Sequence, residues 1–501
     1  MTSLPPDPVD ASYELAGQGR LPEALALIEP LAQRPGADHA QLAAYANTLK
    51  GLGRLDETLA VYQRAIVAAP RSGVAEHNLA ALLGDMSRYP EAEAAARRSF
   101  AKGLDAPETW AVLARALQGQ DRYDEAETAY REALRRRPGM ADVHRDLSQL
   151  IWMRTEDSDA ATAAIVAALR ANPAEWPLAL QLAKALQYAG RTEAAYDVLI
   201  GALARSPGVA DLEISASIIA AELKETVASL RHAEAGYALA PDSLVATVAL
   251  CDAQLGLGRP GPAARLAEAL HQQQPNEQQV LARLATAWRL MDDPRYQRLY
   301  DYDAMVRGWT IDTPPGWPNL EAYLADLGPA LRNANKATAH PYDQSLRQGS
   351  QTQTDLALSP DPVIQAFFKA IDGPIRSHVE WLGQGDDPLR RRNTGRYELQ
   401  GAWSVRLRPH GFHIDHVHQL GWLSSACHIE LPAAVEQSAD HQGWLKFGQP
   451  GVATQPALPP EHFVKPEPGR LVLFPSYMWH GTVPFSGDQD RLTVAFDVIP
   501  A

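Results

Sequence analysis

Cysteine is almost absent from this chain of 501 residues. Only Cys251 and Cys427 occur, and they lie far apart in the sequence. Two distant cysteines do not provide the disulfide framework of a small secreted domain, nor a cysteine-rich zinc site. We therefore expect both to be free thiols.

Long apolar runs are also missing. No stretch approaches the roughly 18 consecutive apolar residues that a membrane-spanning helix needs. The start of the chain, MTSLPPDPVD, has neither the basic segment nor the apolar segment of a secretory signal. The sequence therefore predicts a cytoplasmic protein that does not enter a membrane.

Positive charge is in short supply. Lysine and arginine number 46 against 60 aspartate and glutamate residues, and the formal net charge is -14. Such a chain repels nucleic-acid phosphates, and the brief basic runs at 135–137 and 390–392 are interpreted as solvated surface. We expect no nucleic-acid partner, and the sequence leaves the oligomeric state open.

A repeat runs through the first part of the chain. The length exceeds what one hydrophobic core usually organises, which predicts at least two folding units. Small residues recur every 34 residues, a period typical of stacked helical hairpins. The predicted series is Ala24, Thr58, Ala92, Ala126, Ala160, Ala194 and Ala228.

Each repeat predicts a helical hairpin, because apolar residues recur at helical spacing on both sides of a short turn. In DRYDEAETAYREALRRRP, Ala126, Tyr130, Ala133 and Pro138 follow the order that tetratricopeptide repeats (TPRs) use. Residues 10–290 resemble that family. The small residue is expected where the two helices cross, since a larger side chain would push their axes apart.

The repeat array has two interpretations. Stacked hairpins form a superhelix whose concave groove commonly receives peptides or protein segments. The array could instead serve only as a scaffold or spacer. We favour a groove that binds a peptide or protein partner.

The composition changes after about Ala287, where aromatic and proline-rich text replaces the helical pattern, with one more helix expected near Leu320 to Asn333. Beyond Gly395, short alternating apolar segments bounded by glycine, proline and aspartate predict strands with no helix between them. This pattern favours an antiparallel sandwich or barrel. We therefore expect an α+β multidomain chain with an all-α TPR solenoid at 10–290, a helical linker at 291–335 and a β domain at 336–501.

Histidines concentrate in the predicted β domain, with eight of the 15 in the stretch 410–480. In GFHIDHVHQLGW, His413 with Asp415 and His416 with His418 are each separated by one residue. Each pair can therefore share one face of an extended strand. Either pair could chelate a metal ion.

A third ligand is expected at His480, after the strand-like GRLVLFPSYMW. Three histidines, or two and a carboxylate, cover one face of an octahedral ion and leave the three open positions that non-haem Fe(II) oxygenases need. On the next strand, Arg491 could hold a dicarboxylate with two parallel hydrogen bonds, and Thr493 could add a hydroxyl. A zinc hydrolase is the weaker alternative, because no HExxH motif is present.

The segments PGRLVLFPSYMWHGTVPF, RLTVAFDVIP, GFHIDHVHQLGWLSS and DQSLRQGSQT resemble a bacterial family of TPR-linked oxygenases dependent on 2-oxoglutarate and Fe(II). The resemblance spans nearly the whole chain. It implies a double-stranded β-helix (jelly-roll or cupin-like), with Fe(II) as cofactor and 2-oxoglutarate and O2 as cosubstrates. It further implies that His480 is an iron ligand and that Arg491 and Thr493 bind the far carboxylate of 2-oxoglutarate.

The resemblance leaves the first metal pair open. The wider superfamily uses His-x-Asp, which fits His413 and Asp415, whereas the narrower family keeps His-x-His at His416 and His418. We favour His416 and His418 as catalytic metal ligands together with His480. His413 and Asp415 remain the alternative pair, or residues that orient a ligand imidazole.

The chain departs from the family pattern near this site. Cys427 and His428 stand where aromatic residues are usual, and Gln419 replaces a usual proline. His428 could replace a tyrosine hydroxyl as a donor or enlarge the pocket. The candidate substrate-pocket residues are Arg347, Gln351, Trp422, Ser424 and His428.

These observations predict a dioxygenase that hydroxylates a peptide or protein side chain held by the TPR groove. The alternative is a non-catalytic TPR adaptor with a degenerate oxygenase-like barrel.

Overall fold

The computed structural model describes residues 7–501. The chain divides into two compact units, Met1–Leu150 and Ile151–Ala501. The division falls inside helix α9 (Ala141–Thr155), so the second unit contains the later repeats together with everything C-terminal to them.

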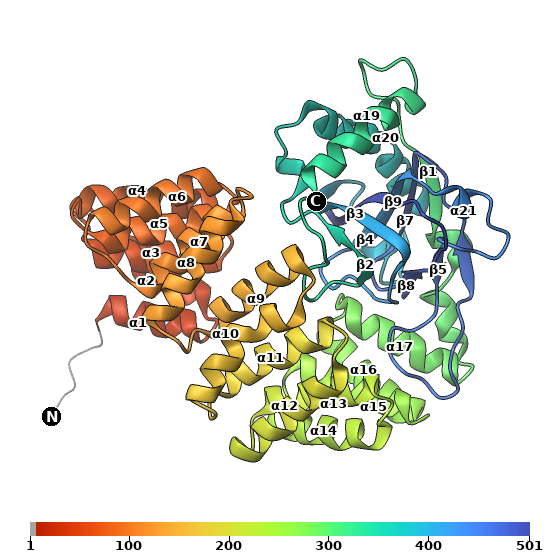
Figure 1. Cartoon of the computed structure of the whole chain (residues 1–501), viewed down its shortest axis with the longest axis horizontal. Helices are drawn as coiled ribbons and strands as arrows, with labels where there is room; N and C mark the ends of the chain where they lie inside the picture. Colours follow the sequence, from red (N-terminus) through yellow and green to blue (C-terminus); the bar gives the residue numbers. More distant parts are fainter. Residues whose placement is uncertain (1–6) are drawn as a thin grey trace. The chain divides into compact units, whose positions relative to one another are not determined.

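Helical hairpins make up the repeat region, as Figure 1 shows. The helices before α9 are α1 (Pro8–Gly17), α2 (Leu21–Ala32), α3 (His39–Gly51), α4 (Leu55–Ala68), α5 (Gly73–Asp85), α6 (Tyr89–Ala101), α7 (Pro107–Gln118) and α8 (Tyr123–Arg136). Those after it are α10 (Ser158–Ala171), α11 (Trp176–Tyr188), α12 (Thr192–Arg205), α13 (Ala210–Glu222), α14 (Thr226–Leu239), α15 (Leu244–Gly256), α16 (Pro260–Gln273) and α17 (Gln278–Leu290).

The small residues of the repeat are buried as predicted only in the first four units. There Ala126, like its three predecessors, is fully buried. In the fifth unit Ala160 is exposed and Ala161 takes the buried position, 35 residues after Ala126. The predicted register is therefore wrong by one residue from Ala160 onward, and Ala195 and Ser229 replace the predicted positions. The shift coincides with α9, which has 15 residues where α7 has 12.

Two antiparallel sheets follow the repeats. The six-stranded sheet has the order β1-β7-β4-β9-β3-β2, and the three-stranded sheet has the order β6-β5-β8. The expected strands and the helix near Leu320 to Asn333 are confirmed, but the expectation of no helix between the strands is wrong, because the short helix Ala433–Glu436 separates two of them. The elements are β1 (Arg307–Thr310), α19 (Leu320–Ala334), β2 (Leu346–Gln351), α20 (Pro362–Leu382), β3 (Tyr397–His413), β4 (Leu423–Glu430), α21 (Ala433–Glu436), β5 (Leu445–Phe447), β6 (His462–Val464), β7 (Arg470–Pro475), β8 (His480–Thr482) and β9 (Arg491–Pro500), with the short α18 (Tyr302–Met305) before β1.

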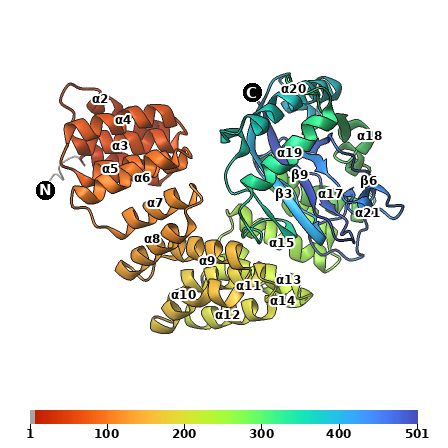
Figure 2. The ribbon, with the colours of Figure 1, turned by 45° about the horizontal axis from the view of Figure 1, so that its top comes forward.

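Helices α19 and α20 lie against the six-stranded sheet, as the two ribbon views show together (Figures 1 and 2). The amphipathic α20 buries Phe367, which packs edge-on against Phe496 of β9. Trp422 and Phe474 extend the same apolar cluster at the other side of β4. This packed core supports the segments at the end of β3 and the start of β8.

The last repeat helix packs directly onto the sheet domain within the second unit. Trp479 donates its indole N–H to Thr286 of α17 at 2.9 Å, and the Arg283 guanidinium lies 4.9 Å from the Trp479 ring centroid. The Trp479 backbone N–H also donates to the Tyr300 hydroxyl at 2.9 Å. Because Trp479 precedes His480, these contacts help to position that histidine.

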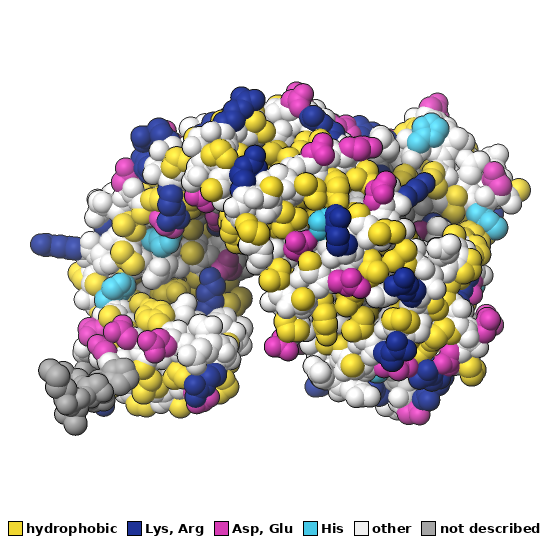
Figure 3. Space-filling view, turned by 90° about the horizontal axis from the view of Figure 1, so that it is seen from below, with side chains coloured by type: hydrophobic (Ala, Val, Ile, Leu, Met, Phe, Trp, Pro, Cys, Tyr) yellow, Lys and Arg dark blue, Asp and Glu magenta, His cyan; other side chains and the backbone are white. Residues whose placement is uncertain are grey.

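Within residues 7–501, no helix has the length and apolar character that crossing a membrane requires. On the face drawn in Figure 3, basic and acidic side chains of the described residues are interspersed rather than gathered into a field of one sign.

Candidate metal centre

Two segments far apart in sequence bring three histidines together. His416 and His418 follow the end of β3, and His480 begins β8. The backbones of His416 and His480 pair as an isolated antiparallel bridge, with N–H to O distances of 2.9 and 3.1 Å. This bridge places the His416 and His480 rings 4.2 Å apart between centroids.

The Nδ1 atom of each of these histidines already has an oxygen partner. His416 Nδ1 lies 2.8 Å from the Ile414 carbonyl oxygen, and His480 Nδ1 lies 2.9 Å from that of Met478. His418 Nδ1 lies 2.7 Å from Asp497 Oδ1. Since these oxygens accept, each Nδ1 carries a proton, and the Nε2 atom of a neutral ring keeps its lone pair.

The Nε2 lone pairs converge as ligands of one ion would. The Nε2 atoms of His416 and His418 are 3.2 Å apart, and ligand nitrogens of all three histidines lie within 4.8 Å of one another. Two neighbouring nitrogens at ~2.1 Å from one octahedral ion would be ~3.0 Å apart. The observed spacing fits two ligands of one ion, and without an ion a proton shared between the two Nε2 atoms satisfies the same contact.

The electrostatics favour neutral, metal-binding imidazoles at two of the positions. Burial, reinforced by the neighbouring His418, lowers the pKa of His416 to about 3. Burial also drives the pKa of His480 well below its usual range. At His418 burial again lowers the pKa, but the Asp497 carboxylate outweighs it and the net shift is upward. Asp497 therefore makes His418 the most basic of the three nitrogen donors.

The alternative pair lies beside this cluster. Asp415 turns to Lys446, whose Nζ is 2.8 Å from Asp415 Oδ2. His413 shares a hydroxyl with the cluster, because Ser345 Oγ is 2.9 Å from His413 Nδ1 and 3.1 Å from His416 Nε2. Among the described residues, the closely spaced donors are the three histidines, without Asp415.

A cavity of about 570 Å³ opens onto the histidine cluster. Arg491 and Thr493 of β9 line it, and Arg491 is only 2% exposed. One guanidinium nitrogen, Nη2, donates to His428 Nδ1 at 3.2 Å, while Nε and Nη1 have no partner among the described residues. Burial lowers the pKa of Arg491 to about 10, so the group stays charged at neutral pH. A buried cation with two free donors is suited to a carboxylate ligand.

Family comparisons agree with this geometry. Residues 401–497 match the family model described as "Putative 2OG-Fe(II) oxygenase", where 2OG is 2-oxoglutarate. The match is confined to this C-terminal part of the chain. Residues 77–141 and 112–175 match the tetratricopeptide repeat. The search of curated proteins gives no match.

Solved structures match parts of this chain at low identity. A Naa15/Naa10 complex bound to HypK-THB is 21% identical over 53% of this chain, with a TM-score of 0.28. A TPR protein from Parabacteroides merdae is 16% identical over 48% of this chain and 96% of its own, with a TM-score of 0.35. YrrB, a TPR protein with an unusual peptide-binding site, is 19% identical over 37% of this chain and 95% of its own, with a TM-score of 0.26. This chain spans only 42% of the Naa15/Naa10 chain.

The predicted pocket residues of the oxygenase domain occupy different surroundings. Gln351 lines the cavity. Trp422 is buried in the core and donates to the Leu389 carbonyl at 2.9 Å. The remaining three are not among the residues that line the cavity. Ser424 donates to Asp497 at 2.7 Å, His428 contacts Arg491, and Arg347 donates to two backbone carbonyls, those of Gln344 and Leu346, at 2.8 Å each.

Sequence reasoning missed Asp497, which the fold makes a partner of His418. A signal for it was present, since Arg491, Thr493, Ala495 and Asp497 alternate along β9 and all line the cavity. The alternation of a strand places residues two apart on one face, so Asp497 shares the face of Arg491. Ser345 was also missed, and no local pattern marks it.

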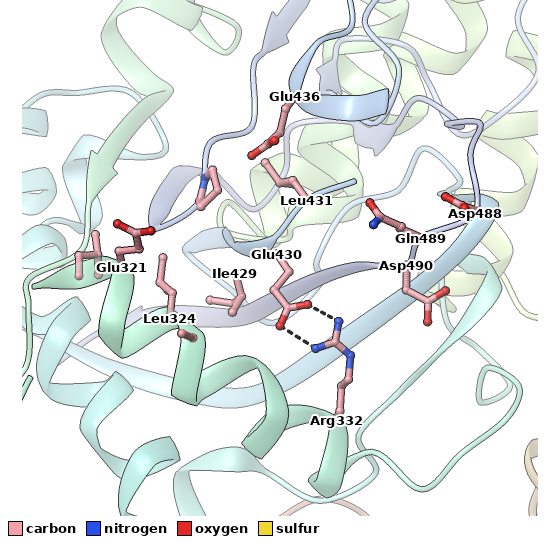
Figure 4. A pocket seen from close by; sticks show the side chains of 13 residues that line it. Glu321, Leu324, Arg332, Ile429, Glu430, Leu431, Glu436, Asp488, Gln489 and Asp490 are labelled. Atoms are coloured by element: carbon pink, nitrogen blue, oxygen red, sulfur yellow. Dashed lines mark hydrogen bonds and ion pairs between the residues drawn. The ribbon is translucent and has the colours of Figure 1, made fainter. Parts of the chain in front are cut away.

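A second cavity of the sheet domain, of about 840 Å³, lies between α19 and the ends of β4 and β9 (Figure 4). Glu321, Glu436, Asp488 and Asp490 contribute carboxylates to its walls. The arginine in its lining, Arg332, already forms an ion pair with Glu430. This cavity therefore offers no free cation for a dicarboxylate, in contrast to the one beside the histidines.

Proposed function

We propose that the chain is an Fe(II)- and 2-oxoglutarate-dependent dioxygenase that hydroxylates a peptide or protein side chain. The observation that carries this proposal is the convergence of three histidine Nε2 atoms beside a buried, half-satisfied guanidinium in one cavity. The histidines supply one face of a metal site, and Arg491 supplies the counter-charge for a dicarboxylate. Neither group alone would distinguish an oxygenase from another metalloprotein.

The proposed ligands are His416, His418 and His480, each through Nε2. Their Nδ1 partners hold the rings in place before an ion binds, so little reorganisation is needed. We propose His413 and Asp415 as neighbours of the centre. Asp415 remains the alternative ligand, because Lys446 holds only its Oδ2 and its Oδ1 has no hydrogen-bond partner among the described residues.

Arg491 and Thr493 are proposed to hold the far carboxylate of 2-oxoglutarate. His428 positions Arg491 by accepting from Nη2, which leaves Nε and Nη1 for the ligand. Fe(II) with bound 2-oxoglutarate and O2 would supply the oxidising chemistry, in which one oxygen atom enters succinate and the other enters a substrate C–H bond while CO2 is released. The chain itself binds and orients the substrate and the cosubstrate, and it excludes water from the cavity.

The architecture is proposed to be a TPR array at 10–290, a link at 291–335 and a double-stranded β-helix at 336–501. The two sheets around the histidines, β1-β7-β4-β9-β3-β2 and β6-β5-β8, are the support for that fold. TPR arrays generally bind peptides or protein segments, which supports a polypeptide substrate. A cytoplasmic location is part of the same proposal.

The full-length protein tests this function with Fe(II) and 2-oxoglutarate under anaerobic conditions. We expect a weak metal-to-ligand charge-transfer band, followed by succinate formation when O2 is admitted. The variant His480→Ala should lose both, whereas His462→Ala, a histidine that stacks on Tyr302 away from the cluster, should keep both. A wild-type protein with no band and no succinate would instead behave as a TPR adaptor.

A further inference from the structure

The repeat array contributes a wall to the reaction cavity. Tyr188, the last residue of α11, lines the same cavity as the three histidines. Helix α11 belongs to a repeat hairpin, and the cavity floor belongs to the sheet domain. Both lie in the second compact unit.

Tyr188 is held firmly in this position. Its ring stacks on Tyr342 with centroids 5.9 Å apart, and the Arg347 guanidinium lies 5.5 Å from the ring centroid. One helical turn earlier, Lys184 forms an ion pair with Asp343 at 2.8 Å, and the Tyr188 hydroxyl donates to the same carboxylate at 3.3 Å. The wall is therefore preformed, since contacts from the sheet domain restrain it on several sides.

The segment that carries Asp343 is tied to the repeats on one side and to the metal centre on the other. Met153 of α9 accepts from the backbone N–H groups of Thr338 and Ala339 at 2.8 and 3.1 Å. Trp152 donates its indole N–H to the His340 carbonyl at 2.9 Å. At its other end, Ser345 reaches His416. The repeats thus fix both Tyr188 and the edge of the cavity beside the proposed ligands.

Two exposed aliphatic side chains line the cavity beside Tyr188. Leu420 and Ile414 line it and are 73% and 40% exposed. The Asp343 carboxylate is balanced by Lys184. The other polar groups at the mouth include the uncharged amide of Gln419. The exposed aliphatic side chains favour an apolar group of a ligand, and the Arg347 guanidinium beside Tyr188, which donates to backbone carbonyls, is the nearby positive charge.

We propose that Tyr188, Ile414 and Leu420 select a peptide substrate by an apolar side chain next to the oxidised residue. The inference rests on the proposed function and names the substrate class for that same site. The apolar side chain would be buried between the repeat wall and the exposed loop residues, while the Gln419 amide faces the peptide backbone. Burying one Leu-sized side chain is worth ~1.5–3 kcal/mol, or on the order of 10-fold or more in binding.

The test uses the full-length protein with Fe(II), 2-oxoglutarate and O2, and randomised capped nonapeptides as the probe. Four pools differ only in the residues beside the central position, which are aliphatic, uncharged polar, basic or acidic. Succinate formation is measured as a ratio to the rate without peptide. We expect the aliphatic pool to give the largest ratio, on the order of 10-fold above the charged pools. Equal ratios, no stimulation by any pool, or a charged pool in first place would overturn the inference.

Variants test whether Tyr188 and Leu420 produce the preference for the aliphatic pool. Tyr188→Ala and Leu420→Ser should each reduce the advantage of the aliphatic pool by several-fold, with each ratio taken to the variant's own rate without peptide. The controls are Tyr13→Ala and Leu358→Ser, exposed residues outside the cavity lining, which should retain the wild-type preference. An unchanged preference in both mouth variants counts against the inference. Failure of the proposed function has a different signature, namely no charge-transfer band and no succinate in the wild-type protein without peptide.

Discussion

The carboxylate of Asp497 should set the strength of the metal site, and Asp497→Asn tests this. Asp497 accepts from His418 Nδ1 and from the Ser424 hydroxyl, both at 2.7 Å, in a largely buried position. Asparagine keeps the size and one acceptor oxygen but removes the charge that makes His418 more basic. Loss of such a carboxylate partner typically weakens metal binding by ~10- to 100-fold, which corresponds to ~1.4–2.7 kcal/mol.

Calorimetric titration of the full-length protein with Co(II), a spectroscopic substitute for Fe(II), measures this loss directly. His418→Ala provides the reference for complete removal of the ligand. The matched control is Asp372→Asn, since Asp372 also pairs with its neighbours, Arg376 and Tyr397, but lies outside the cavity lining. Binding by Asp497→Asn within threefold of wild type, with His418→Ala clearly weakened, would refute the argument that the carboxylate tunes His418.

Three further outcomes follow from the contacts described above. Arg491→Lys keeps the charge but loses the planar pair of donors, so the affinity for 2-oxoglutarate, measured by the charge-transfer band, should fall by ~10-fold or more. The affinity for Co(II) should stay unchanged. Equal 2-oxoglutarate affinity in the variant and the wild type would argue against a two-point carboxylate contact. Ala126→Leu should lower the unfolding free energy by ~1–3 kcal/mol in a denaturant titration, because the site is fully buried, whereas the exposed Ala160→Leu should change it by less than ~0.5 kcal/mol. His378 is buried, and that burial lowers its pKa to about 3. As the pH drops, the histidine is therefore protonated in the unfolded state before it is protonated in the folded state. The unfolding free energy should fall between about pH 6.5 and pH 3. His378→Phe should therefore flatten the pH dependence of the unfolding free energy by up to ~1.4 kcal/mol per pH unit in that window, and an unchanged slope would show that His378 does not stay neutral in the folded protein.

Local periodicity was sufficient to predict most secondary structure. Helix α19 and the strands around the histidines lie where the apolar patterns place them, because a helix or a half-buried strand imposes its own spacing on neighbouring residues. The repeat register shows the limit of such reasoning. The spacing of 34 residues continues through Ala160 in the sequence, but the longer α9 moves the buried position to Ala161. Only packing between helices decides which of two adjacent alanines is enclosed.

The candidate site was partly readable from the sequence. The clustering of histidines and the position of Arg491 one strand later indicated a metal and a dicarboxylate. The choice between the two chelating pairs stayed open, because both obey the alternation of a strand. In the structure Lys446 engages Asp415 Oδ2, and the backbone bridge to His480 aligns His416, which is why our proposal names the His-x-His pair.

The sequence by itself determined the classes of element, their order and the residue types capable of binding a metal, since these depend on composition and on spacing within one segment. The tertiary structure decided which histidines face one point, that Asp497 supports His418, and that Tyr188 from a repeat helix lines the cavity. Those relations join residues up to hundreds of positions apart. They follow from strand pairing and helix packing, whose geometry no local pattern records.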